Sequence, residues 1–156
     1  MRTMSRSQRM RRKKLRTKVK AIPVTRFCLD VDFYDAGDTW RLTHPYTYQT
    51  NIFGYNAVSP SGVRIDERGK LFLPKDFAFD GSGPTIDTED ATRGVAIHDG
   101  LYHLHQYRLI PSDRRKDVDN MFFLILREDG MHPLRADIWH TGVRMGGWYA
   151  WNKKGV

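Results

Sequence analysis

The residues best suited to chemistry lie between positions 80 and 119. A glycine-containing turn at residues 80–83 (D-G-S-G) precedes the pair His98-Asp99, then Tyr102 and finally Asp119. In a helix, residues 98 and 102 share a face, whereas 98 and 99 point about 100° apart. The imidazole can therefore act as a base while the adjacent carboxylate binds something else.

The turn and the carboxylate together predict a site for a hard cation. Backbone carbonyls at Asp80, Gly81 and Gly83 can converge on one point, and Asp99 adds negative charge. Calcium prefers such oxygen ligands, at distances of about 2.3–2.6 Å. We therefore expect calcium as the cofactor of this site.

The histidine needs support from a second acid. Asp119 lies on the next expected helix, where it could hydrogen-bond His98 and fix its tautomer, and Tyr102 is on the same face as His98. A water molecule between base and cation would then suit ester hydrolysis. This chemistry requires an imidazole that reaches solvent.

Two alternatives use the same residues differently. Asp99 could hydrogen-bond the loop amides of Ser82 and Gly83 while His98 packs in the core, so that the cluster is only structural. A transition-metal site with His103 and His105 is the other alternative, but these two side chains face different sides of a helix.

The elements that position these residues predict an α+β fold. Residues 22–79 indicate an N-terminal antiparallel β meander of about five strands, beginning with the alternation of Phe27, Leu29, Val31 and Phe33. Residues 80–150 indicate about three packed helices. The first would be capped by Asp87 or Thr88 and would bury a face made of Val95, His98, Leu101, Tyr102 and His105.

The helices that follow are bounded by prolines. Residues 110–112 (I-P-S) separate the first from the second, and Pro133 or Leu134 opens the third. The apolar residues of the third helix are Ile138, Trp139, Val143 and Met145, and we expect Trp148, Tyr149 and Trp151 to fix the C-terminus to the body.

Composition divides the chain into a tail and one body. The 156 residues suit a single domain over 22–156 with an arm over 1–21, and the one cysteine excludes an internal disulfide. The arm lacks the apolar residues for a core, which predicts disorder. It carries basic residues and no acid, the densest run being Arg9, Arg11, Arg12, Lys13, Lys14, Arg16, Lys18 and Lys20.

This charge predicts a polyanionic partner for residues 1–20. Nucleic acid fits best because Lys and Arg gain affinity by releasing counterions from phosphates, and an anionic membrane surface is a second candidate. No apolar stretch reaches the roughly 18–20 residues that span a bilayer, so we expect no transmembrane segment.

Four motifs resemble a phage-encoded domain family of unknown function. They lie at residues 80–84 (D-G-S-G-P), 98–102 (H-D-G-L-Y), 118–122 (V-D-N-M-F) and 143–146 (V-R-M-G). This resemblance covers about residues 40–150. It implies a phage protein, located in the virion or the host cytoplasm, with other virion proteins as partners.

Residues 80–122 are also similar, more distantly, to the phospholipase A2 class, including the domain inside parvovirus capsids. In that class a glycine-rich calcium loop precedes H-D-x-x-Y, and a later aspartate supports the histidine. The resemblance implies a lipid substrate, calcium ligands at Gly81, Gly83 and Asp99, and a catalytic set of His98, Tyr102 and Asp119. The alternative function is a non-catalytic virion structural or assembly protein whose arm holds packaged nucleic acid.

We predict that deleting residues 1–20 abolishes salt-sensitive nucleic-acid binding, because these residues hold ten of the 26 basic residues. The measurement is a titration of labelled duplex DNA with the full chain and the truncated chain at several salt concentrations. Undiminished binding by the truncated chain would show that the arm is not the contact.

Overall fold

The computed structural model describes residues 33–35, 40–79 and 90–155. Within these ranges short strands come first and α-helices follow, which confirms the predicted α+β class. The strands are β1 (Phe33–Asp35), β2 (Trp40–Leu42), β3 (Tyr46–Gln49), β4 (Ala57–Val58), β5 (Arg64–Ile65), β6 (Lys70–Leu73) and β7 (Ala78–Phe79). The helices are α2 (Thr92–Gln106), α3 (Arg115–Glu128) and α4 (Pro133–Asn152), with a 3₁₀ turn, η1 (Ser112–Arg114), before α3.

The strands form two antiparallel sheets, ordered β1-β2-β7 and β3-β6-β5-β4. Strand β3 pairs with β6 rather than with a sequence neighbour, so the order departs from a simple meander. Alternate residues of a strand share a face, and Leu71 and Leu73 of β6 are both buried for this reason. Of the strand expected over residues 27–33, only Phe33 is among the described residues.

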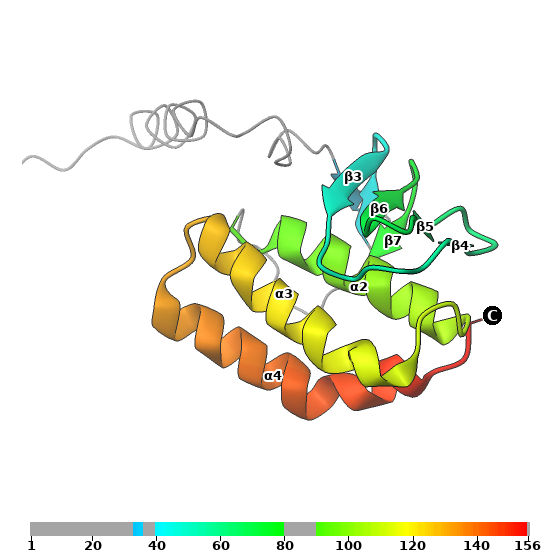
Figure 1. Ribbon diagram of the computed structural model, residues 1–156. Coiled ribbons are helices and arrows are strands. Elements are labelled where there is room, and N and C mark those ends of the chain that lie inside the picture. Colours follow the sequence, from blue (N-terminus) through cyan, green and yellow to red (C-terminus); the bar gives the residue numbers. More distant parts are fainter. Residues whose placement is uncertain (1–32, 36–39, 80–89, 156) are drawn as a thin grey trace, which may run out of the picture.

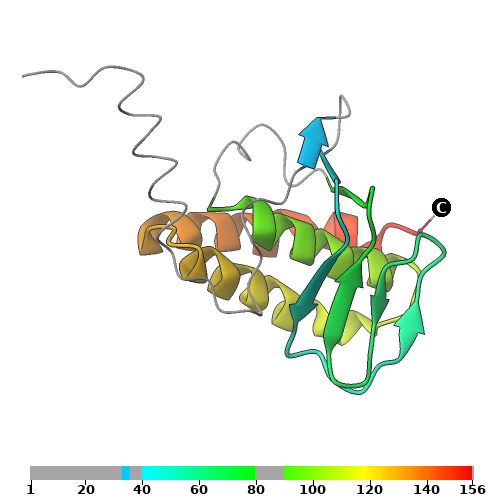
Figure 2. The same cartoon turned by 90° about the horizontal axis from the view of Figure 1, so that it is seen from above.

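Helix α2 is the centre of the molecule, between the strands on one side and α3 and α4 on the other (Figures 1 and 2). Gly100 lets it approach β6, because a Cβ there would collide with the Leu73 side chain. Gly94 lets it approach α3, where a Cβ would lie 3.2 Å from Phe122 and Leu126. The face predicted for this helix is buried throughout. The predicted caps Asp87 and Thr88 lie outside the described residues, and neither caps α2, because the helix begins at Thr92 with Ala91 at its N-cap.

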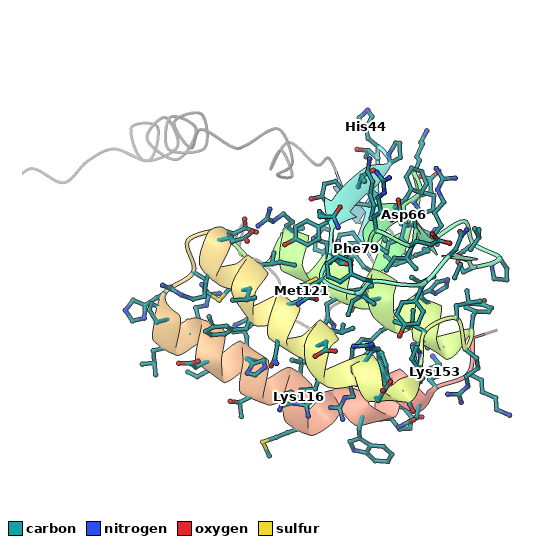
Figure 3. The ribbon with its side chains drawn as sticks, in the orientation of Figure 1. His44, Asp66, Phe79, Lys116, Met121 and Lys153 are labelled. Atoms are coloured by element: carbon teal, nitrogen blue, oxygen red, sulfur yellow. The ribbon has the colours of Figure 1, made fainter. Side chains whose placement is uncertain are left out.

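A buried ion pair joins the start of α2 to the end of α3. The Arg93 guanidinium is 1% exposed and donates to Glu128 Oε2 at 2.8 Å and to Asp129 Oδ2 at 2.9 Å. Figure 3 shows Phe79 and Met121 directed into the interior on either side of α2, whereas His44 lies at the outer end of the strands. The ion pair of Arg93 with Glu128 and Asp129 therefore helps to fix how α2 lies against α3.

Helix α4 begins at Pro133, as predicted, and continues to Asn152. Trp151 is buried and stacks on His105 at 4.0 Å, so it does fix the C-terminus. Of the other apolar residues, Trp139 and Val143 are partly buried and pack against the core. The expected docking of Trp148 and Tyr149 is wrong: like Ile138 and Met145 they are exposed, because α4 turns only one face towards α2 and α3. No helix in the described residues is long and apolar enough to cross a membrane.

We predict that Gly69→Ala lowers the free energy of unfolding by more than about 2 kcal/mol. Gly69 has φ +77°, and a Cβ there would lie 2.8 Å from the Ile52 carbonyl and 3.0 Å from the Thr50 carbonyl. Gly54→Ala is the matched control, since φ is +84° but nothing lies within 4 Å. It should cost only about 1 kcal/mol. Equal costs in urea titrations would contradict the packing described for Gly69.

Candidate active site

The predicted contact between His98 and Asp119 is present. Helices α2 and α3 pack together and bring His98 Nε2 to 2.9 Å from Asp119 Oδ1. The same carboxylate oxygen accepts the Tyr102 hydroxyl at 2.7 Å. Residues 98 and 102 lie one turn apart on α2, so a single acid on α3 can hold both.

Two arginines hold the other oxygen of Asp119. Arg144 of α4 donates to Oδ2 at 2.7 Å, and Arg115 Nε, one turn before Asp119 on α3, lies 3.6 Å from the same atom. Arg115 also donates to the backbone carbonyls of Val143 and Arg144, at 3.0 and 2.7 Å. The Asp119 side chain is fully buried, so its charge is balanced by protein groups rather than by water.

Arg144 and Arg115 were not predicted from the sequence as site residues. Arg144 falls in the V-R-M-G segment at residues 143–146, which was noted only as part of a resemblance. Arg115 is four residues before Asp119, a spacing that places opposite charges together on a helix. Both patterns are visible in the sequence, but neither indicates that α4 lies beside Asp119.

At His98 and at Asp119, burial and hydrogen bonding shift the pKa in opposite directions. Burial would lower the pKa of His98, but the hydrogen bond to Asp119 and the nearby negative charge of Asp99 raise that pKa above its usual value. Burial would raise the pKa of Asp119, but hydrogen bonds from His98, Tyr102 and Arg144 hold it below the usual range. Asp119 is therefore an anion, and the nitrogen of His98 that faces it carries a proton.

Tyr102 is a donor that stays protonated. Burial and the hydrogen bond to Asp119 raise its pKa far above the usual value for a tyrosine. Gly147 of α4 leaves space for the hydroxyl, because a Cβ at that position would lie 2.6 Å from it. Tyr102 thus positions Asp119 and is not itself a base.

The imidazole of His98 is mostly buried, which departs from the exposure that the sequence-based hypothesis requires. Its side chain is 8% exposed and packs on the rings of Tyr102 and Phe122, with ring centres 4.1 and 5.0 Å away. Its second nitrogen, Nδ1, lies 3.6 Å from Asp99 Oδ1, and the Asp99 side chain is 23% exposed. Nδ1 is therefore the ring nitrogen on the side of the partly exposed Asp99.

The residues predicted to bind calcium are only partly described. Asp99 lies beside His98, but Asp80, Gly81 and Gly83 are outside the described residues, as is the basic run from Arg9 to Lys20. No group of three or more His, Cys, Asp or Glu side chains suited to a metal occurs in residues 33–35, 40–79 and 90–155.

His103 and His105 have separate roles and face different sides of α2, as expected. His103 Nε2 is 2.6 Å from Ser61 Oγ, and burial lowers its pKa. His105 Nδ1 donates to the Ile110 carbonyl at 2.7 Å, and burial lowers the pKa of this histidine too. Nothing in these contacts brings the two rings to a common metal.

No family model, curated protein or solved structure matches this chain. The two resemblances therefore stay predictions. The geometry around Asp119 is the basis on which a function can be proposed.

We predict that Asp119→Asn costs about 3 kcal/mol of folding free energy, because it leaves buried cationic groups without their anion. The cost should be larger at about pH 5.5 than at about pH 9. A raised pKa means that His98 contributes stability fully below the unfolded-state pKa of about 6.5, and that this contribution is lost as pH rises through the folded-state pKa.

The measurement is chemical denaturation of wild type and variant at both pH values. Asp117→Asn is the matched control, because Asp117 is on the same helix but its side chain is 43% exposed; it should cost less than about 0.5 kcal/mol. A cost of Asp119→Asn that does not change with pH would show that His98 and Asp119 are not coupled.

Proposed function

We propose that this chain is a phage-encoded hydrolase of the phospholipase A2 type, with His98 as general base and a lipid ester as substrate. The observation that carries the proposal is that Asp119 Oδ1 accepts hydrogen bonds from both His98 Nε2 and Tyr102. This arrangement fixes the tautomer of the neutral imidazole and leaves the lone pair of Nδ1 as the only basic position on the ring.

In the proposed reaction, the lone pair of His98 Nδ1 is the base. Nδ1 takes a proton from water, and the resulting hydroxide forms a bond to the ester carbonyl carbon. When the tetrahedral intermediate collapses, the bond to the alcohol oxygen breaks and the imidazolium returns its proton to that oxygen. Asp119 stabilises the imidazolium, and Arg144 and Arg115 keep Asp119 ionised throughout.

Asp99 supports calcium as the cofactor. Its carboxylate is a hard ligand, it is partly exposed, and it lies on the Nδ1 side of His98, where the water would be. Bound calcium would polarise the ester carbonyl and stabilise the oxyanion. The remaining ligands would come from carbonyls at Asp80, Gly81 and Gly83.

A non-catalytic virion or assembly protein is the second candidate, and the burial of His98 favours it. An imidazole packed on Tyr102 and Phe122 could serve only to join α2 to α3. In that case the basic arm would carry the function by holding packaged nucleic acid. The two candidates differ in whether Nδ1 of His98 ever meets a substrate.

We predict that the full chain releases fatty acid from phospholipid vesicles in the presence of calcium, and that His98→Gln lowers this rate at least about 100-fold. The substitution removes the base but keeps an N–H that can donate to Asp119. The assay is fatty-acid release with added calcium or with a chelator. His44→Gln is the control, since His44 is exposed in the bend between β2 and β3, at the outer end of the strands (Figure 3).

The pH profile gives a second readout in the same assay. The neutral imidazole is the active form, so the rate should rise with pH through the raised pKa of His98, with a midpoint above 6.5. No release of fatty acid, or release that His98→Gln leaves unchanged, would reject the hydrolase and leave the assembly protein.

A further inference from the structure

The outer face of the four-stranded sheet carries a row of residues that crosses every strand. In the register of the sheet, one residue from each of β3, β6, β5 and β4 stands opposite the next: Thr47, Phe72, Arg64 and Val58. Leu71 and Leu73 are buried on the side of β6 that meets α2. Phe72 lies between them in β6 and is therefore on the opposite face, which is turned away from α2.

A hollow of about 250 Å³ lies over this row. Besides the four residues of the row, its walls include Asn56, Asp66 and Lys70, all of which are exposed. Sites that enclose a drug-sized ligand measure roughly 300–1,000 Å³. The hollow on the sheet therefore suits one small group of a larger ligand rather than a whole cofactor.

Arg64 is held as a flat cation above the sheet. Its guanidinium lies over the Phe72 ring, with Cζ 4.1 Å from the ring centre. An arginine stacked on an aromatic ring keeps its plane in place and can offer its outer side to a second flat group. The bases of single-stranded nucleic acid stack on arginine planes as well as on aromatic rings. The pair of Arg64 and Phe72 is thus a stacking platform for a base.

The hollow contains more positive than negative charge. The side chains of Arg64 and Lys70 are exposed, and within residues 33–35, 40–79 and 90–155 neither pairs with a carboxylate. Asp66 contributes a negative charge from the turn before β6 (Figure 3), but its Oδ1 accepts the backbone N–H groups of Arg68 and Lys70 at 3.0 and 2.8 Å. The two cations can therefore bind phosphate, and the second oxygen of Asp66 can accept an N–H from a base edge.

We propose that the outer face of this sheet binds single-stranded nucleic acid, with one base stacked on Arg64 above Phe72 and a neighbouring phosphate on Lys70. Duplex DNA keeps its bases stacked on one another, so it has no free base for this platform. A run of acidic residues offers charge to Arg64 and Lys70 but no base, and Asp66 repels it. The proposal does not depend on ester hydrolysis, because no residue of the hollow belongs to the cluster around Asp119.

We predict that the full chain binds a single-stranded oligothymidylate at least about fivefold more tightly than an abasic oligonucleotide of the same length. Both ligands carry the same phosphates, so the basic residues 1–20 contribute equally to both. Arg64→Lys should remove the difference, because lysine keeps the charge but has no plane on which a base can stack. Arg68→Lys is the matched control, since Arg68 is exposed on the turn before β6 but does not line the hollow.

The measurement is the fluorescence anisotropy of the two labelled oligonucleotides, titrated with wild type and both variants, and circular dichroism should show that all three fold. Equal affinity of the wild-type chain for the two oligonucleotides would overturn the proposal. A difference that survives in Arg64→Lys, or is lost equally in Arg68→Lys, would also overturn it. If wild type shows no difference but polyglutamate binding falls in Arg64→Lys alone, the face belongs to an acidic protein instead.

Photo-cross-linking locates the stacked base. An oligonucleotide that contains iodouracil attaches on irradiation to aromatic side chains that touch the base. With the full chain, trypsin should then release the label on residues 71–75, the peptide that contains Phe72. Arg64→Lys should lower this label several-fold and Arg68→Lys should not. Label confined to residues 1–20 would show that nucleic acid contacts only the basic arm and would reject the site on the sheet.

Discussion

The structure depends on one buried carboxylate. Asp119 has no contact with solvent, yet it is ionised, because His98 and Tyr102 of α2, Arg115 of α3 and Arg144 of α4 surround it. A buried charge is tolerated only where its partners are held in place. The three helices are therefore tied to one geometry at Asp119.

The same constraint gives His98 its chemical character. Because Asp119 occupies Nε2, only Nδ1 can exchange a proton, and Nδ1 is directed towards the side of Asp99. The packing on Phe122 limits the access of water to that nitrogen. A hydrolase and a structural protein would share every interaction of Asp119, and they differ only at the opposite side of the imidazole.

Part of the fold and of the candidate site could be predicted from the sequence. The spacing of His98 and Tyr102 was sufficient to predict a shared buried face, because a helix repeats every 3.6 residues. The contact with Asp119 was a hypothesis from the sequence, and it depends on how α2 packs on α3. The contributions of Arg115 and Arg144 depend on how α4 crosses α2 and α3, which is tertiary information. The exposure of Trp148 and Tyr149 was mispredicted for the same reason: apolar character alone does not reveal which face of a helix is buried.

The central claim is that Asp119 holds the neutral His98 in the tautomer with its proton on Nε2. Nitrogen-15 NMR of the two ring nitrogens, recorded above the pKa of His98, measures this directly. The account predicts a protonated Nε2 and a bare Nδ1 in the wild-type chain. A proton on Nδ1 would contradict it, since the ring would then have no base to offer on the side of Asp99.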